Sequence, residues 1–220
     1  TWAVKNGIQL LTNHQVTSIL RNDQGEVIGL EVLADGESKN LRARRAVVFG
    51  SGGYTHNPEL MLRFQRGPHF GGCAAPTNTG DFIRMGGAIG AQLGNTAGAW
   101  RAEIVLEQAL ADPKGVHNVF YIPGDSVLEV NRYGRRIMDE KRNYTDRAMT
   151  HFIWDPQRAE WTNMLVFMVF DQRTATLWQG FPPYPVQGQE ADYIISAPSL
   201  DGLATGIATR LQDLAPHTGG

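Results

Sequence analysis

The fold is decided by the stretch Ala46-Val47-Val48-Phe49-Gly50-Ser51-Gly52-Gly53. Its apolar residues form a short continuous run, which is typical of a central strand buried on both faces of a sheet. The glycines that follow would let the backbone approach a ligand at the carboxyl edge of that sheet. A tight turn without a ligand is the alternative, and glycines alone do not decide between the two. The sequence therefore predicts an α/β fold, of the mixed α+β kind, with a candidate ligand loop at Gly52 and Gly53.

The residues before this stretch have the pattern of antiparallel strands. Apolar residues at Val16, Ile19 and Leu20 precede the turn signal Asn22-Asp23-Gln24-Gly25. An extended pattern then resumes from 27 to 33. This arrangement predicts a β-meander with a hairpin at 23–25.

Two helix starts follow the glycine stretch. In Asn57-Pro58-Glu59 the asparagine can cap, the proline suits the first helical position, and the glutamate favours the positive end of the helix. Thr79-Gly80-Asp81 opens a second helix, whose exposed N–H groups would suit an anion or a flavin carbonyl. Asp81 could accept a hydrogen bond from a ribityl hydroxyl, or it could simply be a first-turn acid.

The character of the sequence changes after about residue 99, where aromatic residues and prolines become frequent. We therefore expect two parts, 1–99 and 100–220. Strands are expected at 127–130 and 165–170, and helices at 145–152, after the cap Asp171 and after the cap Ser199. The charged run 130–147 is interpreted by default as a solvated, salt-bridged face.

Composition excludes several function classes. A net charge of −2 over 220 residues gives no electrostatic case for nucleic acid or an anionic membrane as partner. The single cysteine, Cys73, excludes an internal disulfide and fits a reducing, cytoplasmic compartment. No apolar run reaches the roughly 20 residues of a membrane helix. The histidines show no metal-ligand spacing, so no metal site is expected; they are His14, His56, His69, His117, His151 and His217.

Four motifs, in order, resemble those of one flavoprotein family. They are Gly7-Ile8-Gln9-Leu10 with Val16 and 25–30, the stretch 46–54, Thr79-Gly80-Asp81 with Gly90-Ala91, and 130–140. Together they resemble the FAD-dependent fumarate reductase, succinate dehydrogenase flavoprotein and 3-ketosteroid dehydrogenase family. The segment 199–204 is also similar to a segment frequent in that family.

This resemblance implies FAD as cofactor, bound by a Rossmann-like domain that is interrupted by an α+β capping domain. Val16 would contact the adenine side through its backbone, Gly52 and Gly53 would lie near the phosphates, and Asp81 would bond the cofactor. The family's amino-terminal Gly-x-Gly-x-x-Gly unit and the stretch that closes over the flavin are missing here. We therefore expect an interior fragment, cut at both ends, that holds at most part of the cofactor cleft and does not bind FAD stoichiometrically.

The resemblance also implies a catalytic residue, Tyr144. In fumarate reductases an arginine that acts as acid stands four residues after the motif glutamate; here Tyr144 stands four after Glu140, and Arg147 is out of register by three. A tyrosine at this position resembles the ketosteroid dehydrogenase branch, in which it takes a proton next to a ketone while hydride leaves for the flavin. Asn143 departs from the proline that is frequent there. Because an ordinary tyrosine has a pKa of about 10, it needs activation, for which Arg142 and Arg147 are candidates.

The expected function is that of an FAD-dependent oxidoreductase acting on a C–C bond next to a carbonyl of a small-molecule substrate, with a 3-ketosteroid as one candidate. A fumarate reductase-like activity with a different acid is an alternative, and a non-catalytic interaction module is another. Apolar surface exposed on such a fragment predicts self-association.

Overall fold

The computed structural model describes residues 1–67, 69–115 and 120–218, so His117 and the terminal Gly219-Gly220 lie outside the described residues. The chain divides into two compact units. Unit 1 consists of Thr1–Asn57 and Asn78–Asn95, and unit 2 consists of Pro58–Thr77 and Thr96–Gly220. Each unit is therefore built from two separate stretches, and the chain passes between the units three times.

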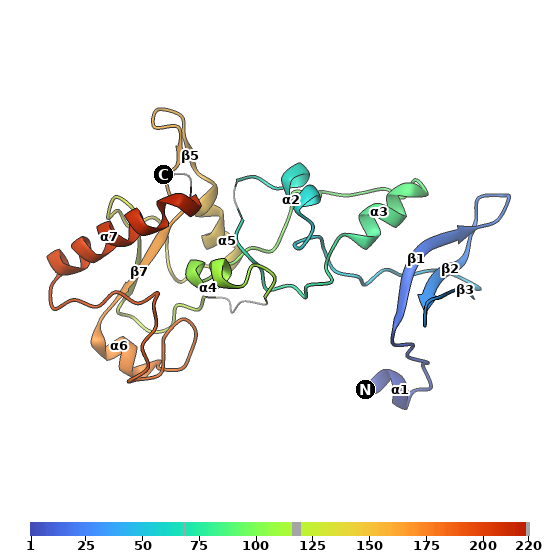
Figure 1. The fold of residues 1–220 in the computed structure, drawn as a ribbon, viewed down its shortest axis with the longest axis horizontal. Helices are drawn as coiled ribbons and strands as arrows, with labels where there is room; N and C mark the ends of the chain where they lie inside the picture. The colour runs from blue at the N-terminus through green and yellow to red at the C-terminus, as the bar shows by residue number, and fades with distance from the viewer. Residues whose placement is uncertain (68, 116–119, 219–220) are drawn as a thin grey trace. The chain divides into compact units, whose positions relative to one another are not determined.

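Unit 1 contains the expected β-meander (Figure 1). Three strands form an antiparallel sheet in the order β1-β2-β3: β1 (His14–Arg21), β2 (Val27–Ala34) and β3 (Glu37–Arg42). The predicted turn is made by Asn22, whose side-chain Oδ1 accepts hydrogen bonds from the N–H groups of Gln24 and Glu26. Val32 and Ala34 are almost fully buried, so the sheet has one covered face.

The strand expected at 46–49 is not formed. Residues 46–50 have irregular backbone, and the side chain of Val48 is 90% exposed. A central strand needs hydrogen-bonding neighbours, and none of the described strands pairs with this run. The prediction was wrong because an apolar run supplies hydrophobicity but not the partners that would complete a sheet.

The two helices of unit 1 are α1 (Trp2–Lys5) and α3 (Asp81–Ala88). The second begins where Thr79-Gly80-Asp81 predicted, and Gly80 precedes it with a left-handed backbone (φ +88°) that glycine adopts without strain. The helix ends at Ala88, before Gly90, which also has positive φ.

Unit 2 combines several short helices and one helix of 19 residues with two small antiparallel ribbons. Its elements are α2 (Pro58–Phe64), α4 (Leu106–Ala111), β4 (Val127–Asn131), α5 (Tyr144–Ala148), the 3-10 helix η1 (Met149–Phe152), β5 (Trp154–Asp155), β6 (Glu160–Trp161), β7 (Val166–Phe170), α6 (Gln172–Leu177) and α7 (Leu200–Thr218). Strand β4 pairs with β7, and β5 pairs with β6. The strands and helices expected in this region are confirmed within one or two residues.

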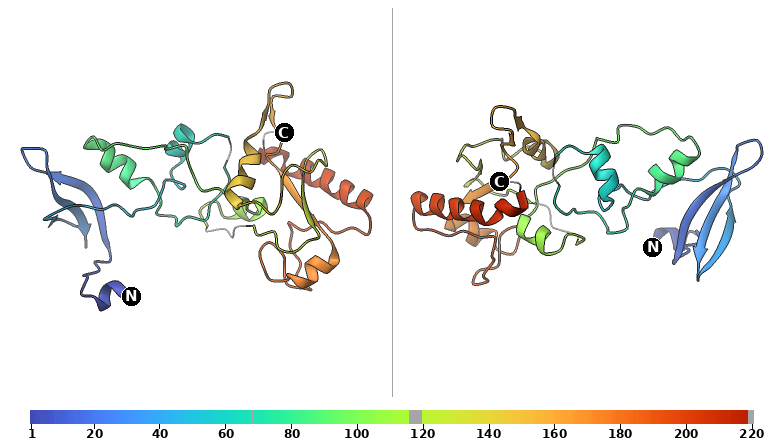
Figure 2. Two further views of the ribbon diagram at one scale, coloured as in Figure 1. Left: turned by 180° about the vertical axis from the view of Figure 1, so that it is seen from behind. Right: turned by 45° about the horizontal axis from the view of Figure 1, so that its top comes forward.

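Local capping explains where two of these helices begin. The Asp171 side chain accepts a hydrogen bond from the N–H of Thr174 at 2.8 Å, and Ser199 Oγ accepts one from Gly202 at 3.2 Å. Both residues were predicted as caps, and each satisfies an N–H that the first turn leaves free. Helix α7 is further tied to α4 by an ion pair between Arg210 and Glu107. The ribbons of α7 (red) and α4 (green) are drawn from two further directions in Figure 2.

The two stretches of unit 2 are joined by specific contacts. Arg101 donates a hydrogen bond to Gln65 Oε1 at 2.5 Å and stacks over the ring of Phe152, 4.9 Å from its centroid. Gly67 has positive φ and packs so closely that a Cβ there would lie 3.3 Å from the Phe152 ring. The segment 58–77 is thus an integral part of unit 2.

The mixed α/β class is therefore confirmed, whereas the Rossmann-like parallel sheet stays a prediction, because the described strand pairs are antiparallel. Among the described residues, no helix is both long and apolar enough to span a bilayer.

Candidate cofactor loop and candidate active-site tyrosine

In unit 1, main-chain hydrogen bonds join the glycine loop to the start of α3. Gly80 N–H donates to the carbonyl of Gly53 at 3.0 Å, and His56 N–H donates to the carbonyl of Asn78 at 3.1 Å. Asn57 Nδ2 adds a bond to the carbonyl of Thr79 at 2.9 Å. The structure therefore brings the predicted residues Gly52, Gly53 and Asp81 into one local cluster, although they lie in separate sequence motifs.

Gly52 is required by this arrangement. It has φ +73°, and a Cβ at this position would lie 2.5 Å from Asn78 Nδ2. A larger residue would strain the backbone, and the Asn78 side chain would have to move to make room for it. Gly53, in contrast, faces open space, since a Cβ there would meet no atom within 4 Å.

Beside these glycines lies an open hollow of about 420 Å³. It is lined by residues 47–52 and by Phe82, whose ring centroid lies 5.4 Å from that of Phe49. This volume falls within the roughly 300–1,000 Å³ typical of ligand sites. The residues expected to form a buried strand therefore form one wall of a hollow instead.

Asp81 stands at the first position of α3, where the helix end favours an anion. Its carboxylate is 3.7 Å from Arg84, and its side chain is 38% exposed, so it remains accessible as a hydrogen-bond acceptor. Val16, the fourth predicted contact, lies in β1 opposite Val32. The hydrogen bonds that join the two loops do not include Val16, and its contact with cofactor stays a prediction.

Tyr144, in unit 2, is the first residue of α5. Asn143 caps this helix by accepting a hydrogen bond from Thr145 N–H at 2.8 Å, which stabilises the turn that contains Tyr144. The side chain of Tyr144 is 37% exposed, and its hydroxyl has no hydrogen bond to any residue that the structure describes. The ring is therefore not packed into the core of unit 2.

The two arginines considered as activators of Tyr144 differ in environment. Arg142 is exposed and lies 3.8 Å from Asp139. Arg147 is only 5% exposed and forms an ion pair with Glu103 at 3.2 Å. The guanidinium of Arg147 is thus already paired inside unit 2.

Arg147 belongs to a buried cluster that the sequence did not predict. The members are Glu103, Glu129, Glu140 and Arg147, each with at most 7% of its surface exposed. The charged run 130–147 was expected to be solvated; its Arg136 and Arg142 are, but its Glu140 and Arg147 are buried. The expectation was wrong because the partner Glu103 lies 44 residues away in sequence, where no local pattern indicates it.

The hydrogen bonds of this buried cluster converge on Glu140 and Arg147. Glu140 Oε1 accepts from the N–H of Glu129 at 3.0 Å, and its other oxygen is 2.5 Å from Arg136 Nη2. Arg147 donates to the carbonyls of Glu140 and Phe120, each at 3.2 Å. Hydrogen bonding from Arg136 lowers the pKa of Glu140 to about 2, whereas burial, with Glu103 nearby, raises the pKa of Glu129 to about 8.

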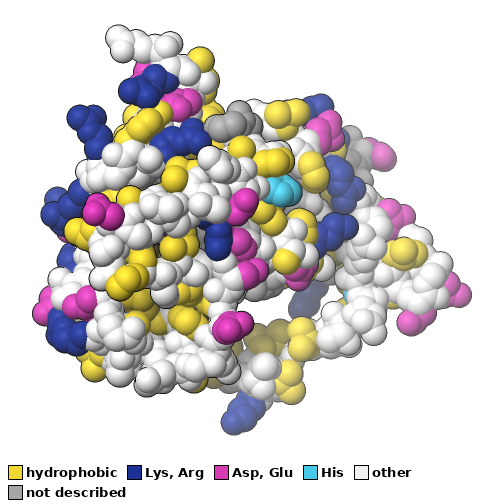
Figure 3. Space-filling model, turned by 60° about the vertical axis from the view of Figure 1, so that its left-hand side comes forward, with side chains coloured by type: hydrophobic (Ala, Val, Ile, Leu, Met, Phe, Trp, Pro, Cys, Tyr) yellow, Lys and Arg dark blue, Asp and Glu magenta, His cyan; other side chains and the backbone are white. Residues whose placement is uncertain are grey.

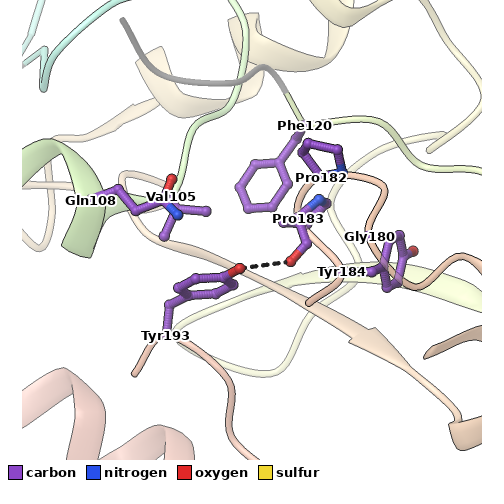
Figure 4. A pocket seen from close by; sticks show the side chains of 8 residues that line it. All are labelled: Val105, Gln108, Phe120, Gly180, Pro182, Pro183, Tyr184 and Tyr193. Carbon is purple, nitrogen blue, oxygen red and sulfur yellow. Dashed lines mark hydrogen bonds between the residues drawn. The ribbon is translucent and has the colours of Figure 1, made fainter. Parts of the chain in front are cut away.

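A second cavity lies within unit 2 and is shown in Figure 4. Its volume is about 100 Å³, and its walls are mostly apolar, with Phe120, Pro182 and Tyr184 among them. The Tyr193 hydroxyl donates a hydrogen bond to the Pro183 carbonyl at 3.1 Å, so this polar atom is already satisfied. The cavity is well below the usual size of a substrate site.

Neither the distribution of charge nor the grouping of metal-ligating side chains indicates a further functional site among the described residues. On the face drawn in Figure 3, acidic and basic side chains are interspersed among apolar ones, and neither sign gathers over it. Within residues 1–67, 69–115 and 120–218, no three His, Cys, Asp or Glu side chains are grouped so that they could hold a metal ion.

Comparison with known proteins identifies relatives. A family described as FAD binding domain matches residues 2–202. The chain is 32% identical to 4-oxocyclohexanecarboxylate 2-dehydrogenase of Sinomonas cyclohexanicum, over 88% of this chain and 33% of that protein. It is 29% identical to 3-oxosteroid 1-dehydrogenase of Mycolicibacterium smegmatis, over 90% of this chain and 36% of that protein. The chain thus spans about a third of the length of these relatives.

A solved structure shares the fold. The 3-ketosteroid delta1-dehydrogenase from Sterolibacterium denitrificans, in complex with 1,4-androstadiene-3,17-dione, superposes with a TM-score of 0.77. The match covers 96% of this chain and 40% of that one, at 22% sequence identity.

Proposed function

Since this chain belongs to the FAD binding domain family, we propose that its protein is an FAD-dependent dehydrogenase of small cyclic ketones. The proposed reaction would remove hydrogen from a C–C bond next to the carbonyl. Both named relatives are dehydrogenases of ring compounds that carry an oxo group, a 4-oxocyclohexanecarboxylate and a 3-oxosteroid. A steroid is therefore one candidate substrate, and a single-ring oxo acid is another.

The observation that carries this proposal is the set of main-chain hydrogen bonds that join the glycine loop of unit 1 to the start of α3. Gly52 permits the close approach of two loops, Gly53 faces open space, and a hollow of suitable volume lies beside them. These features fit the binding of part of an FAD molecule: main-chain groups at Gly52 and Gly53 would lie near its phosphates, and Asp81 would accept a hydrogen bond from it. Val16 is proposed to contact the adenine side.

The chemistry that FAD supplies when bound is acceptance of the hydride removed from the substrate. The chain's own contribution is proposed to be Tyr144, whose phenolic oxygen would take the proton from the carbon next to the ketone. Its support is the tyrosine at the motif position, its exposed side chain and the capped start of α5. Arg142, which is two residues before Tyr144 and more exposed than Arg147, is proposed as the positive charge that favours the phenolate; its own partner, Asp139, lies 3.8 Å away.

The same proposal assigns different roles to the two parts of the chain. Residues 1–99 would supply a part of the cofactor site, and residues 100–220 a part of the substrate-facing cap. A cytoplasmic location is proposed from the single cysteine, Cys73. Self-association is proposed from large exposed apolar side chains such as Val48, Leu62 and Trp100, each at least 86% exposed.

The decisive experiment replaces Tyr144 by phenylalanine in the full protein, which removes only the hydroxyl. Turnover would be measured with a 3-oxosteroid, with 4-oxocyclohexanecarboxylate and with fumarate. We expect activity on one of the two ketones, none on fumarate, and a loss of ~10²–10⁴-fold in the variant, which is the usual contribution of a general base.

The matched control is Tyr133→Phe. Tyr133 is similarly exposed, but its hydroxyl donates to Glu160 at 2.5 Å, and we assign it no catalytic role. Flavin content should be unchanged in both variants. If Tyr144→Phe retains near-normal turnover while a substrate isotope effect shows that chemistry limits the rate, Tyr144 is not the base.

A further inference from the structure

The three buried glutamates of unit 2 share two arginines. Glu140 is paired with Arg136. Glu103 is paired with Arg147. Glu129, on β4 and 2% exposed, is left without an ion pair among the described residues. A buried carboxylate without a cation is strongly disfavoured, so Glu129 is expected to be neutral and to carry a proton.

Two buried oxygen atoms of this cluster have no hydrogen-bond partner, and neither has the buried Nε of Arg147. Glu129 Oε2 and Glu103 Oε1 are both inaccessible to solvent, and both lack a hydrogen-bond partner. A buried polar atom without a partner is costly, and native structures rarely contain one. A protonated carboxyl can donate to a neighbouring carboxylate, and a single such bond from Glu129 to Glu103 would satisfy both atoms.

Arg147 connects this pair to α5. It is a residue of α5, it is held by Glu103 Oε2, and it donates to the carbonyl of Glu140. These two bonds, with a third to the carbonyl of Phe120, brace the segment from 140 to 147, in which Tyr144 lies. We propose that Glu103 and Glu129 share one proton and, together with Arg147, form a latch that holds the start of α5, and with it Tyr144, in place.

Loss of the shared proton would open the latch. A second negative charge would then face Glu103 inside unit 2, and it would compete for the guanidinium of Arg147. The charged and titratable groups that act on Glu129 come from several segments; they are Glu103, Glu140, Arg147 and Tyr184. Burial raises the pKa of Glu129 to about 8, so the proton would leave in mildly alkaline solution. The relevance of the latch to catalysis rests on the proposed function of Tyr144. The existence of the latch does not depend on that function.

The latch is tested by nuclear magnetic resonance on the full protein, with ¹³C labels in the carboxyl groups of glutamate and in the rings of tyrosine. Glu129→Gln identifies the Glu129 signal and keeps a donor for Glu103. Tyr144→Phe identifies the Tyr144 signal. Glu160→Gln is the control, because it breaks a partly buried ion pair with Arg132 that has no part in the latch.

We expect the Glu129 signal to titrate near pH 8 rather than near 4.5, and the Tyr144 signal to move with the same midpoint. The Tyr144 response should vanish in Glu129→Gln and persist in Glu160→Gln. A Glu129 midpoint in the ordinary range, or a Tyr144 signal that ignores it, would overturn the proposal. Because this readout needs no turnover, it can succeed even if Tyr144→Phe remains active and the proposed function fails.

Discussion

Replacing Glu129 by glutamine should change how the stability of unit 2 depends on pH. The folded pKa of Glu129 is raised, from 4.5 to about 8, so the folded protein binds more protons than the unfolded chain between these values. Stability contributed by this site is therefore fully present below about pH 4.5, falls as pH rises toward 8, and is constant above that. Glutamine does not titrate, so the variant should lack this loss.

The size of the effect follows from the same pKa change. Each pKa unit corresponds to about 1.4 kcal/mol, so the difference between variant and parent should grow by at most about 5 kcal/mol between pH 4.5 and pH 8. Relaxation of the buried site and entry of water would reduce it. Even a third of this value is large beside the roughly 5–15 kcal/mol that stabilises a typical domain.

Urea unfolding followed by tryptophan fluorescence is a suitable assay. Four of the five tryptophans lie in unit 2, at 100, 154, 161 and 178, so the signal reports mainly on that unit. Taking the difference between Glu129→Gln and the parent at each pH cancels the other titrating groups, and Glu160→Gln supplies the control series. A difference that stays constant from pH 5 to pH 8 would refute the argument that Glu129 is buried and protonated.

Three further predictions concern the candidate site and the buried cluster. Gly52→Ala should lower the melting temperature and the flavin content, because of positive φ and the clash with Asn78, while Gly53→Ala, facing open space, should leave the melting temperature unchanged; calorimetry of both variants checks this. In the full protein, Asp81→Asn should weaken FAD binding in a fluorescence titration without changing the melting temperature, and equal affinity would argue against its contact with the cofactor. Hydrogen bonding from Arg136 lowers the pKa of Glu140 to about 2, so its contribution to stability should be present above pH 4.5 and lost as pH falls toward 2; in acid unfolding, Glu140→Gln should show a weaker dependence over that range, and an unchanged dependence would contradict the pairing.

Local signals in the sequence were sufficient for most of the helices and strands. Asp171 and Ser199 were predicted as caps because the first turn of a helix needs acceptors, and both make these bonds. The turn at Asn22 was predicted for the same kind of reason, since an asparagine side chain can bond to main-chain groups a few residues ahead. In each case the decisive atoms lie within a few residues of one another.

Features that depend on distant partners could not be predicted in the same way. The run 46–49 is apolar enough for a buried strand, but strand formation requires neighbours that this run does not find among the described residues. The pairing of Arg147 with Glu103 bridges 44 residues, and nothing in the charged run distinguishes a buried arginine from the exposed Arg142. For the candidate site, the motifs predicted Gly52, Gly53 and Asp81, but only the structure revealed that main-chain bonds gather them.

The passage of the chain through both units constrains the order in which the protein can mature on a ribosome. Both stretches of unit 1 have been synthesised once Asn95 is reached, but residues 58–77 emerge between them, ahead of the rest of unit 2. Gln65 cannot form its hydrogen bond until Arg101 has been synthesised. Gly67 cannot pack against Phe152 until a further 85 residues have been translated. For the same reason no single cut in the gene separates the two units, so shuffling or duplication by simple recombination would leave one of them incomplete.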